Sequence, residues 1–178
     1  GEMGATVEEV SLPLTVHGGT ITGALINVES AMTYSDWIRE RLDEFGHSNK
    51  IGLLTGSILP AQAYYKVQKL RELMRRQVQK ALETYDVLIL PTSKSCAPRL
   101  ADDQIVTSKE TATVPPVMTR PFNLANSPAL SVNCGFNSQG LPIGLQIGGR
   151  PFDEETVLKV GHAYEQNTAW HNMRPPNA

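Results

Sequence analysis

The sequence predicts an α/β fold in which helices cover a mixed β-sheet, and three stretches support this prediction. A long amphipathic pattern of helical period follows Pro60, a continuous apolar run occupies residues 87–90, and two strand-like stretches between residues 129 and 148 flank a turn. Helical and strand patterns alternate along the chain, as they do in α/β proteins. At 178 residues the chain is long enough for one domain with a sizeable core.

The first sixty residues predict a strand followed by helices. Residues 7–12 alternate in polarity, which favours a strand, and Pro13 closes it. Residues 18–45 carry apolar side chains at helical intervals, with an interruption near residues 33–35. Residues 50–59 are rich in Gly and Ser, and we expect a loop or a short turn there.

The helical pattern that Pro60 opens is the most regular of the chain. One side is an apolar stripe, which predicts a face buried against the rest of the protein. The other side is basic and allows two interpretations, a nucleic-acid surface or a solvated helix face. We favour the solvated face, because Glu72 is spaced to pair with Arg75 and Arg76 and no aromatic side chains alternate with the basic ones. The stripe consists of Ala63, Val67, Leu70, Met74, Val78, Ala81 and Tyr85, and the basic side chains are Lys66, Lys69, Arg71, Arg75, Arg76 and Lys80.

The middle of the chain predicts a buried strand and a long surface loop. Residues 87–90 form a continuous apolar run, which is typical of a fully buried strand. Residues 101–116 are polar and irregular, so we expect a loop on the surface. We expect Pro121 to end any preceding helix and residues 123–128 to form a polar elbow.

Residues 129–134 and 141–148 predict the two strands of an antiparallel hairpin, joined by a turn at residues 137–140. In the second strand three branched apolar residues alternate with two glycines and Gln146, so one face is apolar and the other nearly bare. A bare face lets a helix or another backbone approach closely. Asp153 is expected to cap the last helix.

Three runs of the sequence resemble one known family. RPFNLANSPALSVNCGF begins at Arg120, GLPIGLQIGGRPFDEETVLKVGHAYEQNTAWH begins at Gly140, and YDVLILPTSKSCAPRL begins at Tyr85. Together they strongly resemble the C-terminal part of the amidase-signature enzymes, the amide hydrolases that include the glutamine-amidotransferase A subunits. The resemblance implies the amidase-signature fold, with residues 1–178 as the C-terminal portion of a single domain whose N-terminal catalytic half is absent.

The family's chemistry is a Ser–cis-Ser–Lys triad that forms an acyl-enzyme from an amide. The nucleophile and much of the oxyanion hole come from a loop rich in Gly and Ser, and no stretch of this sequence resembles that loop. The simpler Gly-x-Ser-x-Gly motif is also absent, because Gly46-His47-Ser48 is followed by Lys50 where the second glycine should stand. We therefore expect no catalytic residue in this chain and no activity from the chain alone.

The loop that leaves the buried strand and the elbow before the hairpin are the expected substrate-side positions. Ligands in α/β sheets tend to lie at such loops, although turn hydrogen bonds explain the first three residues equally well. The resemblance also implies an acidic residue shortly before residue 120 in the amidotransferase subunits, where this chain has uncharged side chains. This difference favours a general amidase over an enzyme that uses free glutamine. The candidate substrate-binding residues are Thr92, Ser95, Cys96, Phe122, Asn123 and Asn126.

Composition narrows the expected partners. With 16 Lys and Arg against 18 Asp and Glu, the net charge of −2 argues against nucleic acid. The N-terminal residues lack a signal-peptide pattern and no run approaches the roughly 20 apolar residues that span a bilayer, so we expect a cytoplasmic protein without membrane contact. The expected partners are a small-molecule amide and the N-terminal half of the same enzyme, and a homodimer stays open.

No cofactor or metal is expected either. The glycines of residues 140–149 fit neither phosphate-binding pattern, and the histidines are dispersed without zinc-ligand spacing. Cys96 and Cys134 are expected to be free thiols. Two alternatives to an amidase half remain: a non-catalytic scaffold subunit related to amidases, and a part of a glutamine-amidotransferase A subunit. The four histidines are His17, His47, His162 and His171.

Overall fold

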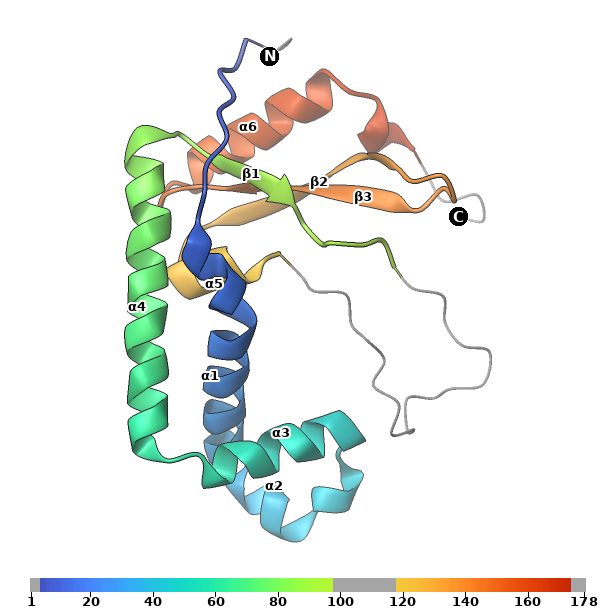
Figure 1. Cartoon of the computed structure of the whole chain (residues 1–178). Helices are drawn as coiled ribbons and strands as arrows, with labels where there is room; N and C mark the ends of the chain where they lie inside the picture. Colours follow the sequence, from blue (N-terminus) through green and yellow to red (C-terminus); the bar gives the residue numbers. More distant parts are fainter. Residues whose placement is uncertain (1–3, 98–117, 174–178) are drawn as a thin grey trace.

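The computed structural model describes residues 4–97 and 118–173, and it shows a small antiparallel sheet from which a helical arm extends (Figure 1). The strands are β1 (Leu88–Pro91), β2 (Ala129–Phe136) and β3 (Pro142–Gly148). Their order is β1-β3-β2, with β3 in the centre. The predicted α/β class, a sheet covered by helices, is confirmed, and both strand pairings in the described part of the chain are antiparallel.

The predicted hairpin of β2 and β3 is confirmed. Ala129 pairs with Gly148 at one end and Phe136 with Pro142 at the other. In the turn, Asn137 Oδ1 accepts hydrogen bonds from the backbone N–H groups of Gln139 and Leu141, both at 2.9 Å. Such side-chain acceptance is why Asn favours turns. A shift of register at residues 133–135, which the sequence pattern does not predict, bends β2 near its end.

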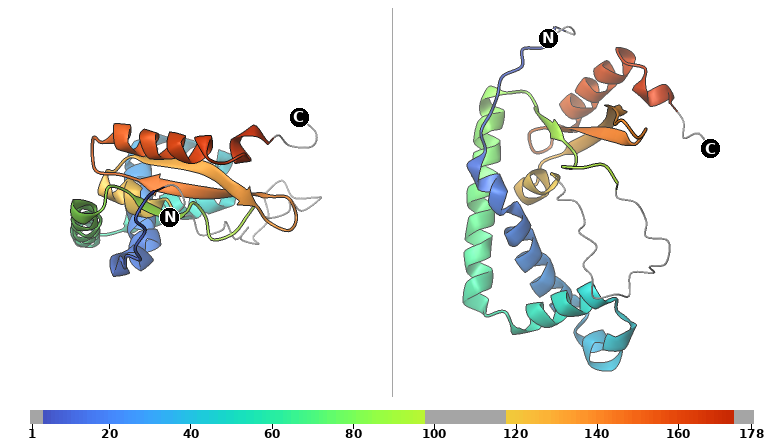
Figure 2. Two further views of the ribbon diagram at one scale, coloured as in Figure 1. Left: turned by 90° about the horizontal axis from the view of Figure 1, so that it is seen from above. Right: turned by 45° about the vertical axis from the view of Figure 1, so that its right-hand side comes forward.

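Two helices cover opposite faces of the sheet. Helix α6 (Glu154–Gln166) packs on β2 and β3, and Asp153 caps it by accepting from the Thr156 N–H at 3.3 Å, as predicted. The short helix α5 (Arg120–Ala125) lies on the other face (Figure 2). Its Phe122 ring occupies the space where a side chain on Gly148 would stand. The bare face of β3 therefore admits a helix, as the alternation predicts.

The arm consists of helices that lead away from the sheet and return. Helix α1 (Gly18–Thr33) runs outward, α2 (Ser35–Glu40), a short 3-10 turn (Leu42–Glu44) and α3 (His47–Ile58) lie at the far end, and α4 (Ala61–Thr84) runs back beside α1 (Figure 1). Helicity from residue 18 to residue 44, with breaks at Tyr34 and Arg41, confirms the predicted, mostly helical character of residues 18–45. A 3-10 turn (Pro13–His17) precedes α1, and another (Trp170–Asn172) follows α6.

Helix α4 confirms the pattern that follows Pro60. Its deepest residues are Met74, Val78 and Leu82, spaced by four, whereas Leu70 of the predicted stripe is 37% exposed. Toward its C-terminal end the buried face of α4 is therefore shifted by one residue from the predicted stripe, so that Leu82 rather than Ala81 is its last buried residue. These residues join two of three core clusters, one with Phe122 of α5 and one with Ile21 and Leu25 of α1.

Four local predictions are wrong. Of residues 50–59, all but residue 59 belong to α3 rather than to a loop, because Leu53 and Gly56 are buried where α3 crosses α1. Residues 7–12 form no strand, since no described strand offers them a hydrogen-bonded ladder. Pro121 lies in the first turn of α5, where a missing N–H costs nothing, so residues 123–125 are helical and the elbow begins at residue 126.

The fourth correction concerns β1. The apolar run at residues 87–90 predicts a fully buried strand, but burial alternates along β1, and Ile89 is 48% exposed. The reason is its position: β1 pairs with β3 on one side only and forms an edge of the sheet among the described strands. The expected surface loop at residues 101–116 lies outside the described residues.

Candidate functional site

The loop after β1 is fixed against the hairpin and the entry to α5 through Thr92. The Thr92 N–H donates to the Gly144 carbonyl of β3 at 2.9 Å, and the Thr92 carbonyl accepts from the Met118 N–H at 2.9 Å. The Thr92 and Ser131 hydroxyls are 2.6 Å apart. Thr92 therefore joins three segments that are distant in the sequence, which is more than a local turn requires.

Ser95 and Cys96 follow on the same loop and are less constrained. Ser95 is exposed and Cys96 is half-buried, with a free thiol. The side chain of neither residue forms a hydrogen bond to another described residue. Cys134, the second free thiol, is half-buried in β2, and its Sγ lies 3.4 Å from the Ile143 carbonyl.

The three candidates on α5 have different environments. Phe122 is 2% exposed and is a core residue that also lines a cavity. Asn123 is exposed to solvent. Asn126 ends α5 in the left-handed region at φ 56°, and its Oδ1 accepts from Arg71 Nη2 of α4 at 2.8 Å. Asparagine tolerates this backbone region better than most residues, which explains the choice at the helix end.

The six predicted residues do not converge on one point. Thr92 follows the last residue of β1. Asn126 lies near the opposite end of the sheet, three residues before β2, whose first residue Ala129 pairs with Gly148, as does the first residue of β1. Helix α5 spans the distance between the two ends: its entry touches Thr92 and its exit contacts α4. The candidates are thus spread along α5 and the adjoining sheet and do not form a compact catalytic cluster.

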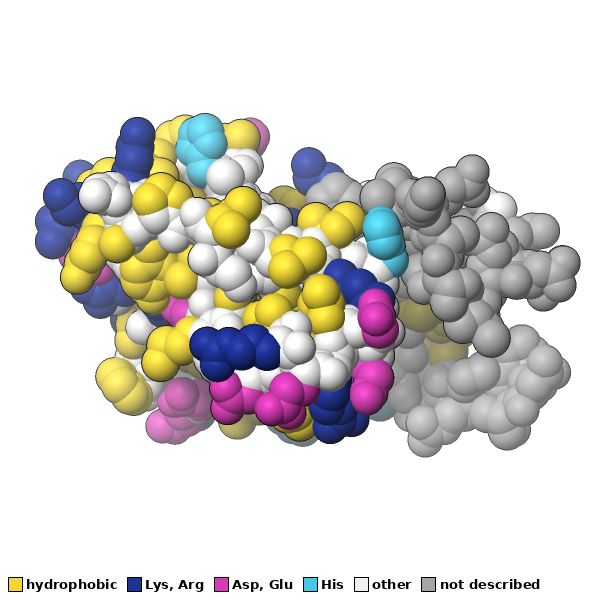
Figure 3. Space-filling model, turned by 90° about the horizontal axis from the view of Figure 1, so that it is seen from below, with side chains coloured by type: hydrophobic (Ala, Val, Ile, Leu, Met, Phe, Trp, Pro, Cys, Tyr) yellow, Lys and Arg dark blue, Asp and Glu magenta, His cyan; other side chains and the backbone are white. Residues whose placement is uncertain are grey.

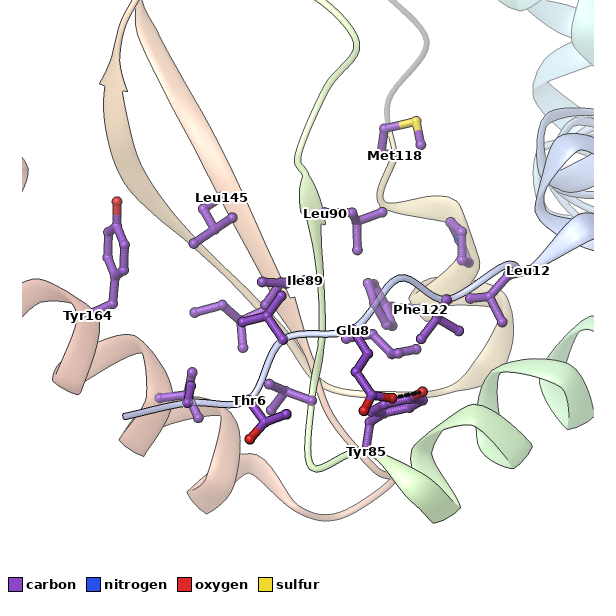
Figure 4. A pocket seen from close by; sticks show the side chains of 18 of the residues that line it. Thr6, Glu8, Leu12, Tyr85, Ile89, Leu90, Met118, Phe122, Leu145 and Tyr164 are labelled. Carbon is purple, nitrogen blue, oxygen red and sulfur yellow. Dashed lines mark hydrogen bonds between the residues drawn. The ribbon is translucent and has the colours of Figure 1, made fainter. Parts of the chain in front are cut away.

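A cavity of about 560 Å³ lies beside this layer, and sequence reasoning missed it. The irregular segment before α1 passes in front of β1, and the cavity reaches from Phe122 and Leu90 on the α5 side to Leu145 and Tyr164 on the α6 side (Figure 4). Its walls come from segments far apart in the sequence, so no local pattern reveals it. The apolar lining is Ala5, Val7, Val10, Leu12, Val87, Leu88, Ile89, Leu90, Met118, Pro121, Phe122, Leu145, Ile147, Val160 and Ala163.

Polar groups are few in the cavity wall and are partly paired with each other. Tyr85 Oη donates to Glu8 Oε2 at 2.8 Å, and this hydrogen bond, with some burial, raises the pKa of Tyr85 (Figure 4). Burial raises the pKa of Tyr164 on the opposite wall. Both phenols therefore stay neutral at physiological pH, and Glu8 holds the N-terminal segment to the end of α4.

The cavity can bind an apolar group, but its described lining contains no Ser, Cys, His or Lys. A nucleophile–base pair of the kind that acyl transfer needs is therefore not formed by these walls. Within residues 4–97 and 118–173 no group of three His, Cys, Asp or Glu side chains could hold a metal ion. None of the described helices is both long and apolar enough to cross a membrane.

Comparisons with known proteins agree on one family. A family model described as Amidase matches residues 2–158. The chain is 34% identical over 197 residues to the glutamyl-tRNA(Gln) amidotransferase A subunit of Oceanobacillus iheyensis, covering 97% of this chain and 40% of that protein. It is 36% identical over 159 residues to the A subunit of the same enzyme from Rippkaea orientalis, covering 85% of this chain and 32% of that protein.

Solved structures give the same result. A crystal structure of an amidase superposes with a TM-score of 0.78 at 28% identity and covers 92% of this chain and 38% of that one. The glutamyl-tRNA(Gln) amidotransferase A subunit of Thermotoga maritima superposes with a TM-score of 0.69 at 27% identity, covering 93% of this chain and 35% of that one. A bacterial aryl acylamidase has the same fold, with a TM-score of 0.81 at 20% identity and coverage of 98% of this chain and 40% of that one.

The alignments cover nearly all of this chain but less than half of each relative. The chain spans about 40% of the length of the relative from Oceanobacillus iheyensis. The described residues of the three runs that resemble the amidase-signature enzymes lie in β1 and the stretch after it, in α5, in the hairpin, in α6 and at the start of the 3-10 turn that follows α6. The chain therefore belongs to the amidase-signature family.

Proposed function

We propose that this chain is the C-terminal part of an amidase that hydrolyses carboxamide C–N bonds. The single observation that carries the proposal is the family match, which covers residues 2–158 of this chain although the chain spans only about 40% of a relative. The catalytic residues then belong to the other part of the complete protein. This chain supplies sheet strands, covering helices and part of the wall around the substrate.

The reaction proposed for the complete enzyme is acyl transfer through a Ser–cis-Ser–Lys triad. The serine oxygen attacks the amide carbonyl while its proton passes through the bridging serine to the lysine. The C–N bond breaks, the amine leaves with a proton, and water hydrolyses the resulting ester. Backbone N–H groups stabilise the oxyanion that forms at each step.

A free strand edge and exposed apolar side chains support the proposal that a second part of the protein packs against this chain. The outer edge of β1 pairs with no described strand, and Ile89 on it is 48% exposed. Val7, which faces the same cavity, is 65% exposed. An unpaired strand edge beside an apolar cavity is a surface that complete proteins commonly cover or protect. The proposed partners are therefore the N-terminal half of the same enzyme and a small amide.

The candidate residues contribute to this proposal in different ways. The stretch that contains Thr92, Ser95 and Cys96 follows the end of β1, and Thr92 bonds it to β3 and to the entry of α5. Phe122 supplies apolar surface to the cavity, and the exposed side chain of Asn123 is free to meet a ligand or the N-terminal half. Asn126 is proposed to act at a distance, because its amide oxygen is already bonded to Arg71.

A second candidate is part of a glutamine-amidotransferase A subunit. The relatives that favour it are the amidotransferase A subunits, which are 34% and 36% identical to this chain. Hydrolysis of free glutamine would favour this candidate, and cleavage of aryl or alkyl amides without glutaminase activity would favour the general amidase. The uncharged Met118 and Thr119 at the entry to α5 agree with the general amidase.

The test is release of ammonia or amine, together with the carboxylic acid, from a panel of amides by two preparations. The complete protein, made from the gene that encodes this chain with its upstream part, is expected to cleave at least one amide. The 178-residue chain alone is expected to cleave none. A complete, folded protein that releases neither ammonia nor an amine from aryl, alkyl and peptide amides would contradict the proposal.

A further inference from the structure

The outer edge of β1 carries backbone groups that no described strand pairs. The Thr92 N–H donates to the Gly144 carbonyl, and in the same antiparallel register Leu90, two residues earlier, also turns its backbone groups toward β3. The alternate residues, Ile89 and Pro91, therefore turn their backbone groups away from β3, toward the open edge. Such an edge is a template for a further strand.

The segment of residues 7–12 has the pattern of a strand but no strand to pair with. Val10 and Leu12 pack on the core cluster of α4, α5 and β1, whereas Glu9 and Ser11, which alternate with them, are exposed. This period of two is that of a half-buried strand. No described strand forms a ladder with the segment, although it lines the same cavity of about 560 Å³ as β1 (Figure 4).

The cavity is apolar on both faces of the sheet. Ile89 pairs with Ile147, which belongs to the core cluster beneath α6, yet Ile89 is 48% exposed because no described strand lies beyond it. Val160 of α6 lines the cavity on this face and Phe122 of α5 on the other. A strand beside β1 directs alternate side chains to both faces, and a strand with two apolar faces is a nearly continuous apolar run.

Pro91 limits what can pair with this edge. It turns outward but has no N–H, so a ladder on β1 loses a donor there. Ile89 is then the residue of β1 with an outward N–H. Prolines at sheet edges also discourage pairing between identical chains, which disfavours a second copy as the partner. The edge of four residues is roughly 13 Å long, the length of a short strand.

The occupant that fits is a segment of the rest of the protein. The chain spans about 40% of a relative's length, so a complete protein has further segments to supply a strand. The one charged side chain in the described cavity wall is Glu8, and its carboxylate already accepts from Tyr85 Oη. An uncharged, apolar strand therefore suits the cavity better than a charged ligand does.

We propose that an apolar β-strand from outside residues 1–178 lies in this cavity and pairs with β1 through the N–H and carbonyl of Ile89. On its other side the strand gives residues 7–12 the ladder that they lack. The proposal rests on the proposed function only in that this chain is part of a longer protein. It also explains why residues 7–12 have a strand pattern without forming a strand.

The first test is hydrogen exchange of single backbone amides in the complete wild-type protein. The Ile89 N–H is expected to exchange within about tenfold of the rate of the Leu90 N–H, which faces β3. At an unpaired edge the Ile89 N–H would exchange at least ~100-fold faster than that of Leu90. This second result would overturn the proposal, and because the comparison needs no variant, it is decisive even where a substitution prevents folding.

The second test identifies the occupant. The photoreactive residue p-benzoylphenylalanine replaces Ile89 in the complete protein, and mass spectrometry locates the crosslink that light produces. We expect the crosslink on an apolar run outside residues 1–178. The matched control is the same probe at Leu158, which is 58% exposed on α6 and outside the cavity wall, and it should not label that run.

The other outcomes contradict the proposal. Crosslinks between two copies would assign the edge to a dimer, and crosslinks confined to residues 1–178 would leave the cavity to a small apolar ligand. Neither test depends on turnover. A complete protein that protects Ile89 but cleaves no amide would refute only the proposed function, and an active amidase with a freely exchanging Ile89 amide would refute only this inference.

Discussion

Gly148 shows at the scale of one residue how the sequence permits the sheet to pack. A Cβ at this position would overlap the Phe122 ring, which is 2% exposed and lies in the largest core cluster. We expect Gly148→Ala to destabilise the chain by about 1–3 kcal/mol, because a buried ring or the backbone must move. Urea unfolding measures the change.

The control for this prediction is Gly23→Ala in α1. A Cβ on Gly23 meets no atom within 4 Å, and alanine is the better helix former, so no loss of stability is expected. Equal stability of Gly148→Ala and the wild type would contradict the packing of α5 on β3. The alternation of β3 predicts that this face is bare, but the ring that fills it lies outside the hairpin and could not be named from the pattern.

Glu72 predicts a pH dependence of stability. Hydrogen bonds from Arg75 and Arg76 lower the pKa of Glu72 from 4.5 to about 2. Because the folded protein favours the ionised form, the stabilisation is present above the unfolded pKa of 4.5 and is lost as the pH falls through about 2. The difference in Tm between wild type and Glu72→Gln should therefore be constant above the unfolded pKa of 4.5 and should vanish as the pH falls through about 2.

The effect of Glu72 is expected to be small, since the ion pair with Arg76 is largely exposed. Glu83→Gln is the matched control, because this exposed carboxylate of α4 makes no ion pair with another described residue. A Tm difference for Glu72→Gln that persists unchanged at pH 2 would argue against the depressed pKa. The spacing of Glu72, Arg75 and Arg76 predicts this cluster correctly from sequence.

At the scale of elements, Arg71 connects α4 to the end of α5. Its Nε donates to the Leu124 carbonyl at 3.2 Å and its Nη2 to Asn126 Oδ1 at 2.8 Å. We expect Arg71→Met to lose about 1–2 kcal/mol of stability, because a helix-end carbonyl and an amide lose a donor. Lys69→Met, on the same helix and exposed without an ion pair in the described chain, should change stability little. Equal losses for the two variants, measured by urea unfolding, would contradict this role.

The elements that the sequence predicts are those defined by local signals. The hairpin has alternating strands and a turn that begins with Asn and ends with Gly, α4 has a long amphipathic stripe, and α6 has Asp153 as its cap. Helix α3 is not predictable in this way, because its glycines favour a loop and only the close approach to α1 favours a helix. A Cβ on Gly56 would overlap the Asn27 carbonyl oxygen, so glycine is what permits the crossing.

At the scale of the whole molecule, the described chain leaves apolar surface and a strand edge uncovered. Figure 3, which views the end of the arm from below, shows hydrophobic side chains dispersed among charged ones rather than a uniformly polar surface. Met32 and Ile58 in the arm are each 82% exposed. The free edge of β1 and the cavity beside it lie at the other end of the molecule. Contacts between distant segments form these features, so the sequence predicts the family but neither the cavity nor the free edge.

If the complete protein is an amidase as proposed, its nucleophile is expected to lie outside residues 1–178. Treatment of the complete enzyme with a fluorophosphonate, followed by proteolysis and mass spectrometry, locates the serine that reacts. We expect the label on a peptide from the rest of the protein, and we expect the 178-residue chain alone to take up none. A label on any serine of this chain, such as Ser95 or Ser131, would contradict the proposal and place the catalytic centre within the chain itself.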